Sequence, residues 1–158
     1  MRTSAGLLMF RKGTSGLEVL LVHPGGPFFR NKDEGAWSIP KGEASENEDL
    51  QKRAITEFQE ELGVAASGNL IPLGWVKQKG GKTVHAWAVE GDLKSDFVLA
   101  SNTFEMEWPT RSGKRQTFPE VDRAQFFPLE DARRKINSAQ QAFLDRLSEI
   151  ARQPNALE

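Results

Sequence analysis

Residues 42–64 read GEASENEDLQKRAITEFQEELGV, and this segment indicates the architecture of the chain most clearly. It predicts a helix over residues 45–62, because Ser45 and Glu48 form a Ser-x-x-Glu capping box at its start. Gly63 follows the last apolar position, where a left-handed helix end favours glycine. The apolar residues recur at the spacing of one helix face: Leu50, Ala54, Phe58 and Leu62.

The segments on either side of this helix are predicted to be strands joined by glycine-rich turns. Apolar runs at 3–11 and 17–23 flank one such turn, and runs at 70–79 and 82–90 flank Gly80-Gly81. Each pair indicates a β-hairpin. Further elements are expected as short strands at 37–39, 104–108 and 124–127 and as helices at 129–136 and 138–152.

Hairpins mixed with helices predict one α+β domain over residues 1–158. Because hairpins pair their strands antiparallel, we expect a mixed sheet covered by helices on both faces, in contrast to a fully parallel doubly wound sheet. Two long segments, 24–35 and 91–119, are expected mainly as loops. Long loops in a compact domain often carry function.

Composition disfavours a nucleic-acid binder and excludes the classes of protein that need cysteine. Lys plus Arg total 21 and Asp plus Glu total 22, whereas a dedicated nucleic-acid binder normally carries a basic excess. The absence of cysteine excludes disulfides, thiolate metal sites and cysteine nucleophiles. No stretch approaches the ~20 apolar residues of a membrane span, so we expect a cytoplasmic protein without a membrane partner. His23 and His85 lie far apart without a Gly-x-Ser-x-Gly motif, which leaves a Ser-His-Asp hydrolase unsupported.

The central helix carries three acids that can converge. Glu57, Glu60 and Glu61 stand at i, i+3 and i+4, so their like charges raise one another's pKa and destabilise a bare helix. A divalent cation would neutralise them, and carboxylate oxygens favour Mg²⁺, with Mn²⁺ as the alternative. The loop before the helix can present the backbone carbonyl of Lys41 to the same ion. For the acids alone, the competing interpretation is a solvated acidic face.

The offsets within this segment resemble the Nudix box, which reads Gly, five residues, Glu, seven residues, Arg-Glu-apolar-x-Glu-Glu-x-Gly-apolar. Thr56 stands at the arginine position. Residues 23–43 and 102–127 also look similar to a bacterial, MutT-like subgroup described only as predicted NTP pyrophosphohydrolases. The box positions that match are Gly42, Glu48, Glu57, Phe58, Glu60, Glu61, Gly63 and Val64.

The resemblance implies the Nudix α/β/α sandwich and Mg²⁺-dependent cleavage of the pyrophosphate bond in a nucleoside diphosphate linked to a group X. It makes Glu57, Glu60 and Glu61 the metal ligands, together with the Lys41 carbonyl. Gly42 and Glu48 would brace the loop. The metal would neutralise phosphate oxygens and lower the pKa of the attacking water.

Thr56 leaves one role of the box open, because the family arginine pairs with box glutamates and orients them. Lys52 and Arg53 are the two candidates to replace it. The loss is also the only support in the sequence for a non-catalytic, nucleotide-sensing Nudix domain.

A further carboxylate from outside the box is expected as catalytic base or additional ligand. Glu120 is the first candidate, because similar family members carry a glutamate at this offset from the aromatic residue of the last strand. Glu105 and Glu107 are the alternatives. The competing interpretation for each is an exposed loop acid.

The two long segments also suggest the kind of substrate. Phe28 and Trp108 are candidates to stack on bases, and Arg111 and Lys114 are candidates to bind distal phosphates. Two aromatic segments favour dinucleoside polyphosphates over nucleoside triphosphates. A nucleotide is therefore the expected partner, with RNA 5′ ends as a rival substrate that the balanced charge disfavours. The chain is expected to be a monomer or a homodimer.

Overall fold

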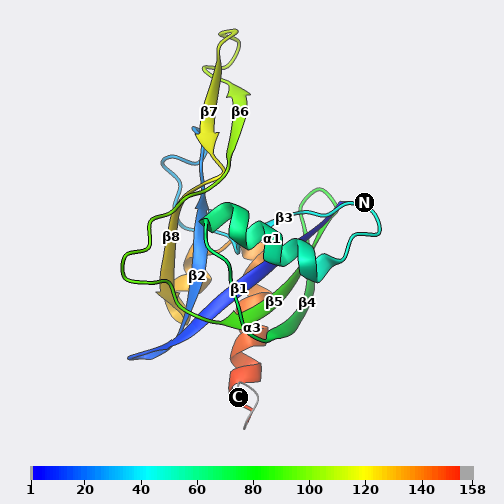
Figure 1. Cartoon of the computed structure of the whole chain (residues 1–158), viewed down its shortest axis with the longest axis vertical. Helices are drawn as coiled ribbons and strands as arrows, with labels where there is room; N and C mark the ends of the chain where they lie inside the picture. Colours follow the sequence, from blue (N-terminus) through cyan, green and yellow to red (C-terminus); the bar gives the residue numbers. More distant parts are fainter. Residues whose placement is uncertain (1, 154–158) are drawn as a thin grey trace.

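A six-stranded mixed β-sheet forms the centre of the computed structural model, which describes residues 2–153 (Figure 1). Its strand order is β4-β5-β1-β2-β8, with β3 paired to β1. Strand β1 runs parallel to β5 and antiparallel to β2 and β3, so the predicted mixed sheet is confirmed. The strands are β1 (Thr3–Gly13), β2 (Gly16–Pro24), β3 (Lys41–Glu43), β4 (Leu70–Gln78), β5 (Lys82–Glu90) and β8 (Val121–Pro128).

Strand β1 lies inside the sheet and is buried on both faces, which explains its uninterrupted apolar run. Since side chains alternate along a strand, Leu7 and Leu8 enter different cores. Leu7 packs with Phe58 of helix α1 (Leu50–Leu62), whereas Leu8 packs with Phe143 of helix α3 (Gln141–Ala151). Helices therefore cover both faces of the sheet, as the α/β/α sandwich requires.

Helix α1 begins at Leu50, later than the predicted start at Ser45. Asn47 has a φ of 62°, which interrupts helical geometry, and the Asp49 side chain then caps the helix by accepting the N–H groups of Gln51 and Lys52. The expected Ser45–Glu48 hydrogen bond exists, with a length of 2.9 Å, but it closes the turn before the helix. Gly63 ends the helix with a φ of 82°, as predicted.

On the other face, the expected terminal helix begins as a 3₁₀ turn, η1 (Ser138–Gln140), because the Asn137 side chain caps it at Ala139. Helix α2 (Leu129–Lys135) confirms the shorter predicted helix. The segment at 37–39 forms only single bridges, from Ser38 to Val22 and from Trp37 to Ile136. The pairing strand begins after Pro40 instead, as β3. No helix within residues 2–153 has the length and apolarity to cross a bilayer.

The segment at 91–119 contains a hairpin of β6 (Thr103–Glu107) and β7 (Arg115–Pro119), which projects from the body of the protein as a separate sheet (Figure 1). Alternation of apolar and acidic residues predicted β6. Strand β7 was not predicted, because its sequence, RQTFP, is mostly polar and exposed. The rings of Phe104 and Phe118 lie 6.0 Å apart on the inner side of the hairpin.

Candidate active site

Gly42 brings the loop before α1 against the acidic face of that helix. A Cβ atom on Gly42 would lie 1.4 Å from Oε1 of Glu57, so any other residue at this position would displace the Glu57 carboxylate. In β3, Gly42 pairs with Ala5 of β1, so the sheet fixes the position of the loop. Glycine at this position therefore leaves the space that the Glu57 carboxylate occupies. The loop-bracing position expected from the sequence thus lies beside one of the acids.

The predicted acids differ in burial along α1. Glu57 and Glu61 are partly buried, whereas Glu60 is exposed. Glu61 lines a cavity of about 160 Å³ together with Lys41 and Glu120, at the end of β2 near Pro24. Helix α1, strand β3 and the start of β8 thus contribute polar groups to one cavity. Three of the residues singled out in the sequence, from distant segments, meet there.

Burial and charge change the acidity of these groups. Burial, followed by the charges of Glu57 and Glu120, raises the pKa of Glu61 to about 8, while Lys41 opposes this change. Burial and the neighbouring Glu60 carboxyl raise the pKa of Glu57. Burial lowers the pKa of the Lys41 ammonium, although Glu61 opposes the shift. Glu57 and Glu61 are therefore harder to ionise than free carboxyl groups, and a bound cation would favour their ionised forms.

Backbone hydrogen bonds hold Glu120 at this cavity. Its N–H donates to the carbonyl of Asn102 over 2.9 Å, and its own carbonyl accepts the N–H of Gly25 over 2.9 Å. Asn102 in turn donates its N–H to the carbonyl of Glu60 over 2.9 Å. The root of the β6–β7 hairpin is thus attached to α1 at an acidic residue, and Glu120 lies between the hairpin and β8.

The two alternative carboxylates belong to the hairpin itself. Glu105 lies 3.9 Å from Arg115, and Glu107 accepts the N–H of Arg111 over 2.9 Å. Neither lines the cavity that Glu61 and Glu120 share. Among the three candidates, the structure therefore brings only Glu120 to the acidic face of α1.

Thr56, at the arginine position of the box, is exposed. Another basic side chain, Arg53, pairs with the box glutamates. The guanidinium of Arg53 contacts both Glu48, at 2.7 Å, and Glu57, at 3.1 Å. Lys52 is exposed, and its ammonium group makes no ion pair in the part of the chain that the structure describes. Of the two candidates named from the sequence, Arg53 is the one that touches the box glutamates.

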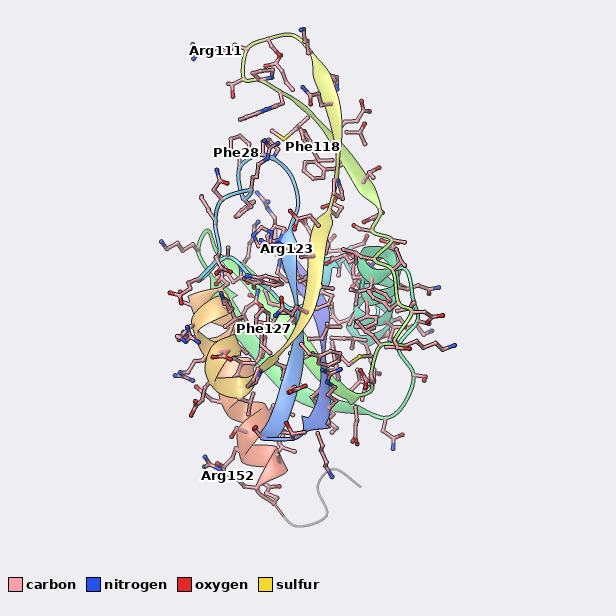
Figure 2. All side chains as sticks on the ribbon, turned by 90° about the vertical axis from the view of Figure 1, so that its left-hand side faces the viewer. Phe28, Arg111, Phe118, Arg123, Phe127 and Arg152 are labelled. Atoms are coloured by element: carbon pink, nitrogen blue, oxygen red, sulfur yellow. The ribbon has the colours of Figure 1, made fainter. Side chains whose placement is uncertain are left out.

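The expected substrate-binding residues lie on two neighbouring segments. The ring of Phe28, which is 58% exposed, meets the ring of Trp108 edge-on at 5.5 Å. Arg111 lies at the tip of the hairpin, beyond Phe28 on its loop (Figure 2), and Lys114 follows in the same turn. The structure therefore brings the two aromatic residues together and places the two cations farther from the body. Substrate contact by these four residues stays a prediction.

A buried histidine attaches the loop at 24–35 to the sheet. The Nδ1 atom of His23 lies 2.8 Å from the Asp122 carboxylate, and its Nε2 atom lies 2.7 Å from the carbonyl of Lys32. Both ring nitrogens of His23 thus have an oxygen partner, one from β8 and one from the loop. Sequence reasoning missed Asp122 as its partner, because no local pattern connects strands β2 and β8.

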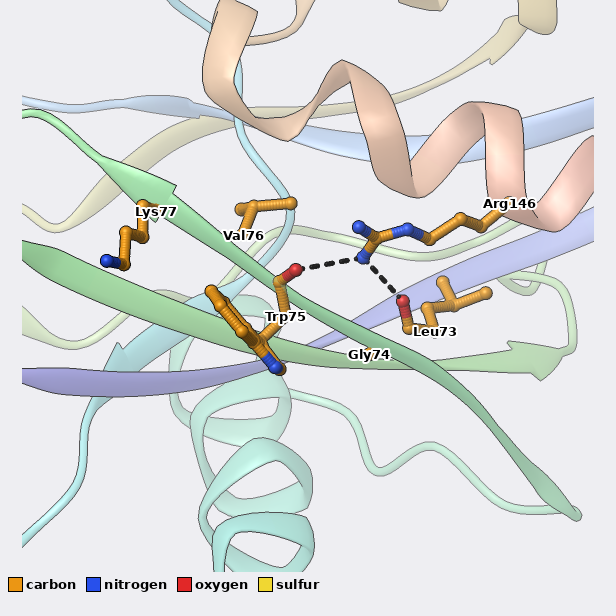
Figure 3. Close-up of a pocket in the computed structure, with 6 residues that line it drawn as sticks. All are labelled: Leu73, Gly74, Trp75, Val76, Lys77 and Arg146. Carbon is orange, nitrogen blue, oxygen red and sulfur yellow. Dashed lines mark hydrogen bonds between the residues drawn. The ribbon is translucent and has the colours of Figure 1, made fainter.

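A second cavity, of about 620 Å³, lies at the edge strand β4 and on the side of α3 (Figure 3). The Nη1 atom of Arg146 donates to the carbonyls of Leu73 and Trp75 there, over 2.9 and 3.0 Å. Its lining contains the cations Lys77 and Arg146 but no carboxylate. The acid-lined cavity is therefore the better candidate for a metal-dependent reaction.

The donors at the acid-lined cavity suit a hard divalent cation. Carboxylates and backbone oxygens are the ligands that Mg²⁺ and Mn²⁺ prefer. Within residues 2–153, no three acidic or histidine side chains already surround one point. Mg²⁺ usually retains several waters and takes few ligands from a protein, so this open arrangement still fits the ion. Glu57, Glu60, Glu61 and the Lys41 carbonyl are the groups that would hold it.

Comparison with known proteins agrees with this geometry. A family model described as the NUDIX domain matches residues 1–147, so the chain belongs to the Nudix family. Membership supports a hydrolase that acts on pyrophosphate bonds in general. No curated protein matches the chain in sequence.

Solved structures of Nudix proteins share the fold. An Ap4A hydrolase of C. elegans in a binary complex is 22% identical, with a TM-score of 0.66, over 94% of this chain and 97% of that chain. A MutT protein from Methanosarcina mazei Go1 is 19% identical, with a TM-score of 0.61, over 96% of each chain. The NUDIX domain of Shewanella oneidensis NrtR, complexed with ADP ribose, is 16% identical over 93% of this chain and 86% of that chain, with a TM-score of 0.62. These similarities show the sandwich fold.

Proposed function

We propose that the protein is a Mg²⁺-dependent pyrophosphohydrolase that cleaves a nucleoside diphosphate linked to a group X. One observation carries this proposal: Glu61, Glu120 and Lys41 line a single cavity beside Glu57, although they come from separate elements. Membership of the Nudix family gives the reaction class, and the cavity supplies the acids that such a reaction needs.

The acids divide into two roles. Glu57, Glu60 and Glu61, with the Lys41 carbonyl, hold Mg²⁺, or Mn²⁺ in its place. When bound, the ion would neutralise the charge of the diphosphate oxygens and lower the pKa of the attacking water. Gly42 allows the loop to approach Glu57, and Glu48 braces the same loop through Arg53.

Glu120 is proposed as the proton acceptor. It is a carboxylate from outside the helix, and it lines the same cavity as Glu61. As the water oxygen bonds to phosphorus, its proton passes to the Glu120 carboxylate and the bridging P–O bond breaks. Positioned general bases typically contribute about 10²–10⁴-fold in rate.

For the substrate, we propose dinucleoside polyphosphates in preference to nucleoside triphosphates. Phe28 is exposed and Trp108 is partly exposed, and both lie on segments that are attached near the cavity, since Gly25 bonds to Glu120 and Glu120 bonds to Asn102. Arg111 and Lys114 add positive charge farther along the hairpin. The C. elegans Ap4A hydrolase shares only the fold with this chain, so the aromatic pair is the main support.

A non-catalytic nucleotide sensor is the second candidate, and Thr56 is the observation that favours it. Incubation of the protein with Mg²⁺ and a panel of diadenosine tetraphosphate, ATP, dGTP and ADP-ribose separates the two functions. We expect cleaved nucleotides, identified by ion-exchange chromatography, from the wild type and from the Glu130→Gln control on α2. Binding of a nucleotide without cleavage would contradict the enzymatic function.

A further inference from the structure

Arg53 joins the loop before α1 to the acidic face of the helix. Its Nε and Nη2 atoms contact Oε2 of Glu48 at 2.9 and 2.7 Å, and its Nη1 atom contacts Oε2 of Glu57 at 3.1 Å. The exposed fractions of the three side chains are 26% for Arg53, 25% for Glu48 and 15% for Glu57. A planar guanidinium that binds two partly buried carboxylates fixes the orientation of both.

These contacts continue into the loop on both sides. Oε1 of Glu48 accepts the N–H of Ser45 over 2.9 Å. Glu57 presents Oε2 to Arg53, while its Oε1 lies where a Cβ of Gly42 would be. Glu48 thus connects Arg53 to the loop through Ser45, and Glu57 approaches the loop closely at Gly42. Arg53 thus holds Oε2 of the Glu57 carboxylate, and the absence of a side chain at Gly42 leaves room for Oε1.

We infer that Arg53 is a positioning residue, which replaces the arginine missing at Thr56 by holding the Glu57 carboxylate in the orientation that a divalent cation needs. Helix geometry allows this, since residues four apart lie on the same face. Arg53 and Glu57 have this spacing and form an ion pair, whereas Thr56 is exposed and carries no charge that could hold Glu57. The inference rests on the proposed function, because it concerns the same metal site.

Lys52 provides the contrast that makes the inference testable. It precedes Arg53 and carries the same charge, but it is exposed and contacts neither Glu48 nor Glu57. Long-range electrostatics alone predicts that removing either cation strengthens binding of a divalent metal. If Arg53 orients Glu57, removal of Arg53 should instead weaken metal binding, whereas removal of Lys52 should not. The direction of the change therefore distinguishes positioning from simple charge.

The experiment titrates Mn²⁺ into the nucleotide-free protein and follows free Mn²⁺ by electron paramagnetic resonance. We expect Arg53→Ala to weaken binding about 10- to 100-fold, as is typical when a partner of a metal ligand is removed. Lys52→Ala should leave binding unchanged or slightly stronger. Arg53→Lys, which retains the charge but loses the planar fork, should give an intermediate loss and guards against misfolding of the alanine variant.

The inference would be overturned if both Arg53 variants bound Mn²⁺ as tightly as the wild type or more tightly. It would also be overturned if Arg53→Ala and Lys52→Ala weakened Mn²⁺ binding equally. Thermal melts without metal verify that each variant is folded. If the wild type binds Mn²⁺ but cleaves no nucleotide, the proposed enzymatic function is contradicted. The Mn²⁺ titrations of the variants still decide whether Arg53 positions Glu57. A wild type that binds no Mn²⁺ would overturn both.

Discussion

Glu61 of helix α1 and Glu120 at the start of β8 line one cavity, although they lie on opposite sides of the β6–β7 hairpin in the sequence. After burial and the charge of Glu57, the Glu120 carboxylate contributes to the raised pKa of Glu61. Glu61 lies on the helix that carries the other proposed ligands, whereas Glu120 comes from a separate segment, so the two acids are suited to different roles, one as a ligand and the other as a base. The cavity therefore places the proposed proton acceptor, Glu120, next to a proposed metal ligand, Glu61.

Without metal, the protein should lose stability as the pH rises towards 8. The pKa of Glu61 is about 8 in the folded protein and close to 4.5 in the unfolded chain, so the folded state binds the additional proton between these values. The stabilising effect of that proton is complete below about pH 4.5 and disappears as the pH rises through 8. Calorimetry in EDTA should show a falling melting temperature from pH 6 to pH 8.

Glu61→Gln should flatten this dependence, because glutamine does not titrate. Added Mg²⁺ should stabilise the wild type more at pH 8 than at pH 6, since metal and proton compete for the same carboxylate. A pH profile of Glu61→Gln that parallels the wild type would show that the dependence arises elsewhere.

Loss of a proposed metal ligand should abolish most activity without unfolding the protein. Glu60→Gln and Glu61→Gln should each lower the rate at least ~100-fold, the scale of losing an electrostatic group at a reacting centre. Removal of like-charge repulsion should leave the metal-free helix as stable as before or more stable. Initial rates at matched Mg²⁺ test this, with Glu130→Gln as an exposed glutamate on the other side of the sheet. Wild-type turnover by both variants would refute the ligand assignment.

Glu120→Gln should lower kcat about 10²–10⁴-fold with little change in KM, because proton transfer matters mainly in the transition state. Glu105→Gln and Glu107→Gln serve as controls, since their side chains belong to the hairpin and not to the cavity. Steady-state kinetics on one nucleotide decides between them. An unchanged kcat in Glu120→Gln, with a large loss in a hairpin variant, would assign the base to the hairpin.

Thr56→Arg should change the rate of the wild-type enzyme by less than about threefold, because Arg53 already contacts Glu48 and Glu57. In an Arg53→Ala background, the same substitution should recover part of the lost activity. The two measurements form a double-mutant cycle, whose interaction free energy reports whether the positions share one role. A large gain from Thr56→Arg alone would instead indicate that Arg53 fails to replace the box arginine.

Diadenosine tetraphosphate should have a higher kcat/KM than ATP or ADP-ribose. Trp108→Ala should remove part of this preference, since stacking on one base contributes about 1–3 kcal/mol in nucleic-acid binding proteins. Arg111→Ala combined with Lys114→Ala should raise KM more for longer polyphosphates, and more at low salt, because exposed charges are screened. Equal or better efficiency on nucleoside triphosphates would contradict the preference for two bases.

Periodic and motif signals predicted the parts of the molecule that depend on local sequence. Helix α1, its Gly63 end and the β1–β2 hairpin follow from spacing alone. The start of α1 was predicted too early, because a left-handed Asn47 and the Asp49 cap compete with the Ser45 capping box. Strand β7 was missed because its stability comes from pairing with β6 and not from its own polar sequence.

The candidate site divides in the same way. Convergence of Glu57 and Glu61 was readable from helical spacing, but the choice between Lys52 and Arg53 needed the path of the loop that carries Glu48. The contact between His23 and Asp122 depends on the pairing of β2 with β8, which no local pattern encodes. Sequence spacing identifies the side chains that share a face of one element. Pairing of the strands determines which side chains from distant segments lie next to them.

Arg146 has a consequence for how copies of the protein can assemble. Strand β4 forms one edge of the sheet, and exposed edges invite strands of other molecules to pair with them. The Arg146 guanidinium already occupies the carbonyls of Leu73 and Trp75, at a point where the pairing register with β5 shifts. An incoming backbone therefore finds these acceptors taken and the ladder interrupted. Lengthening of the sheet is therefore disfavoured at the middle of β4, where the half-exposed indole of Trp75 offers side-chain surface instead.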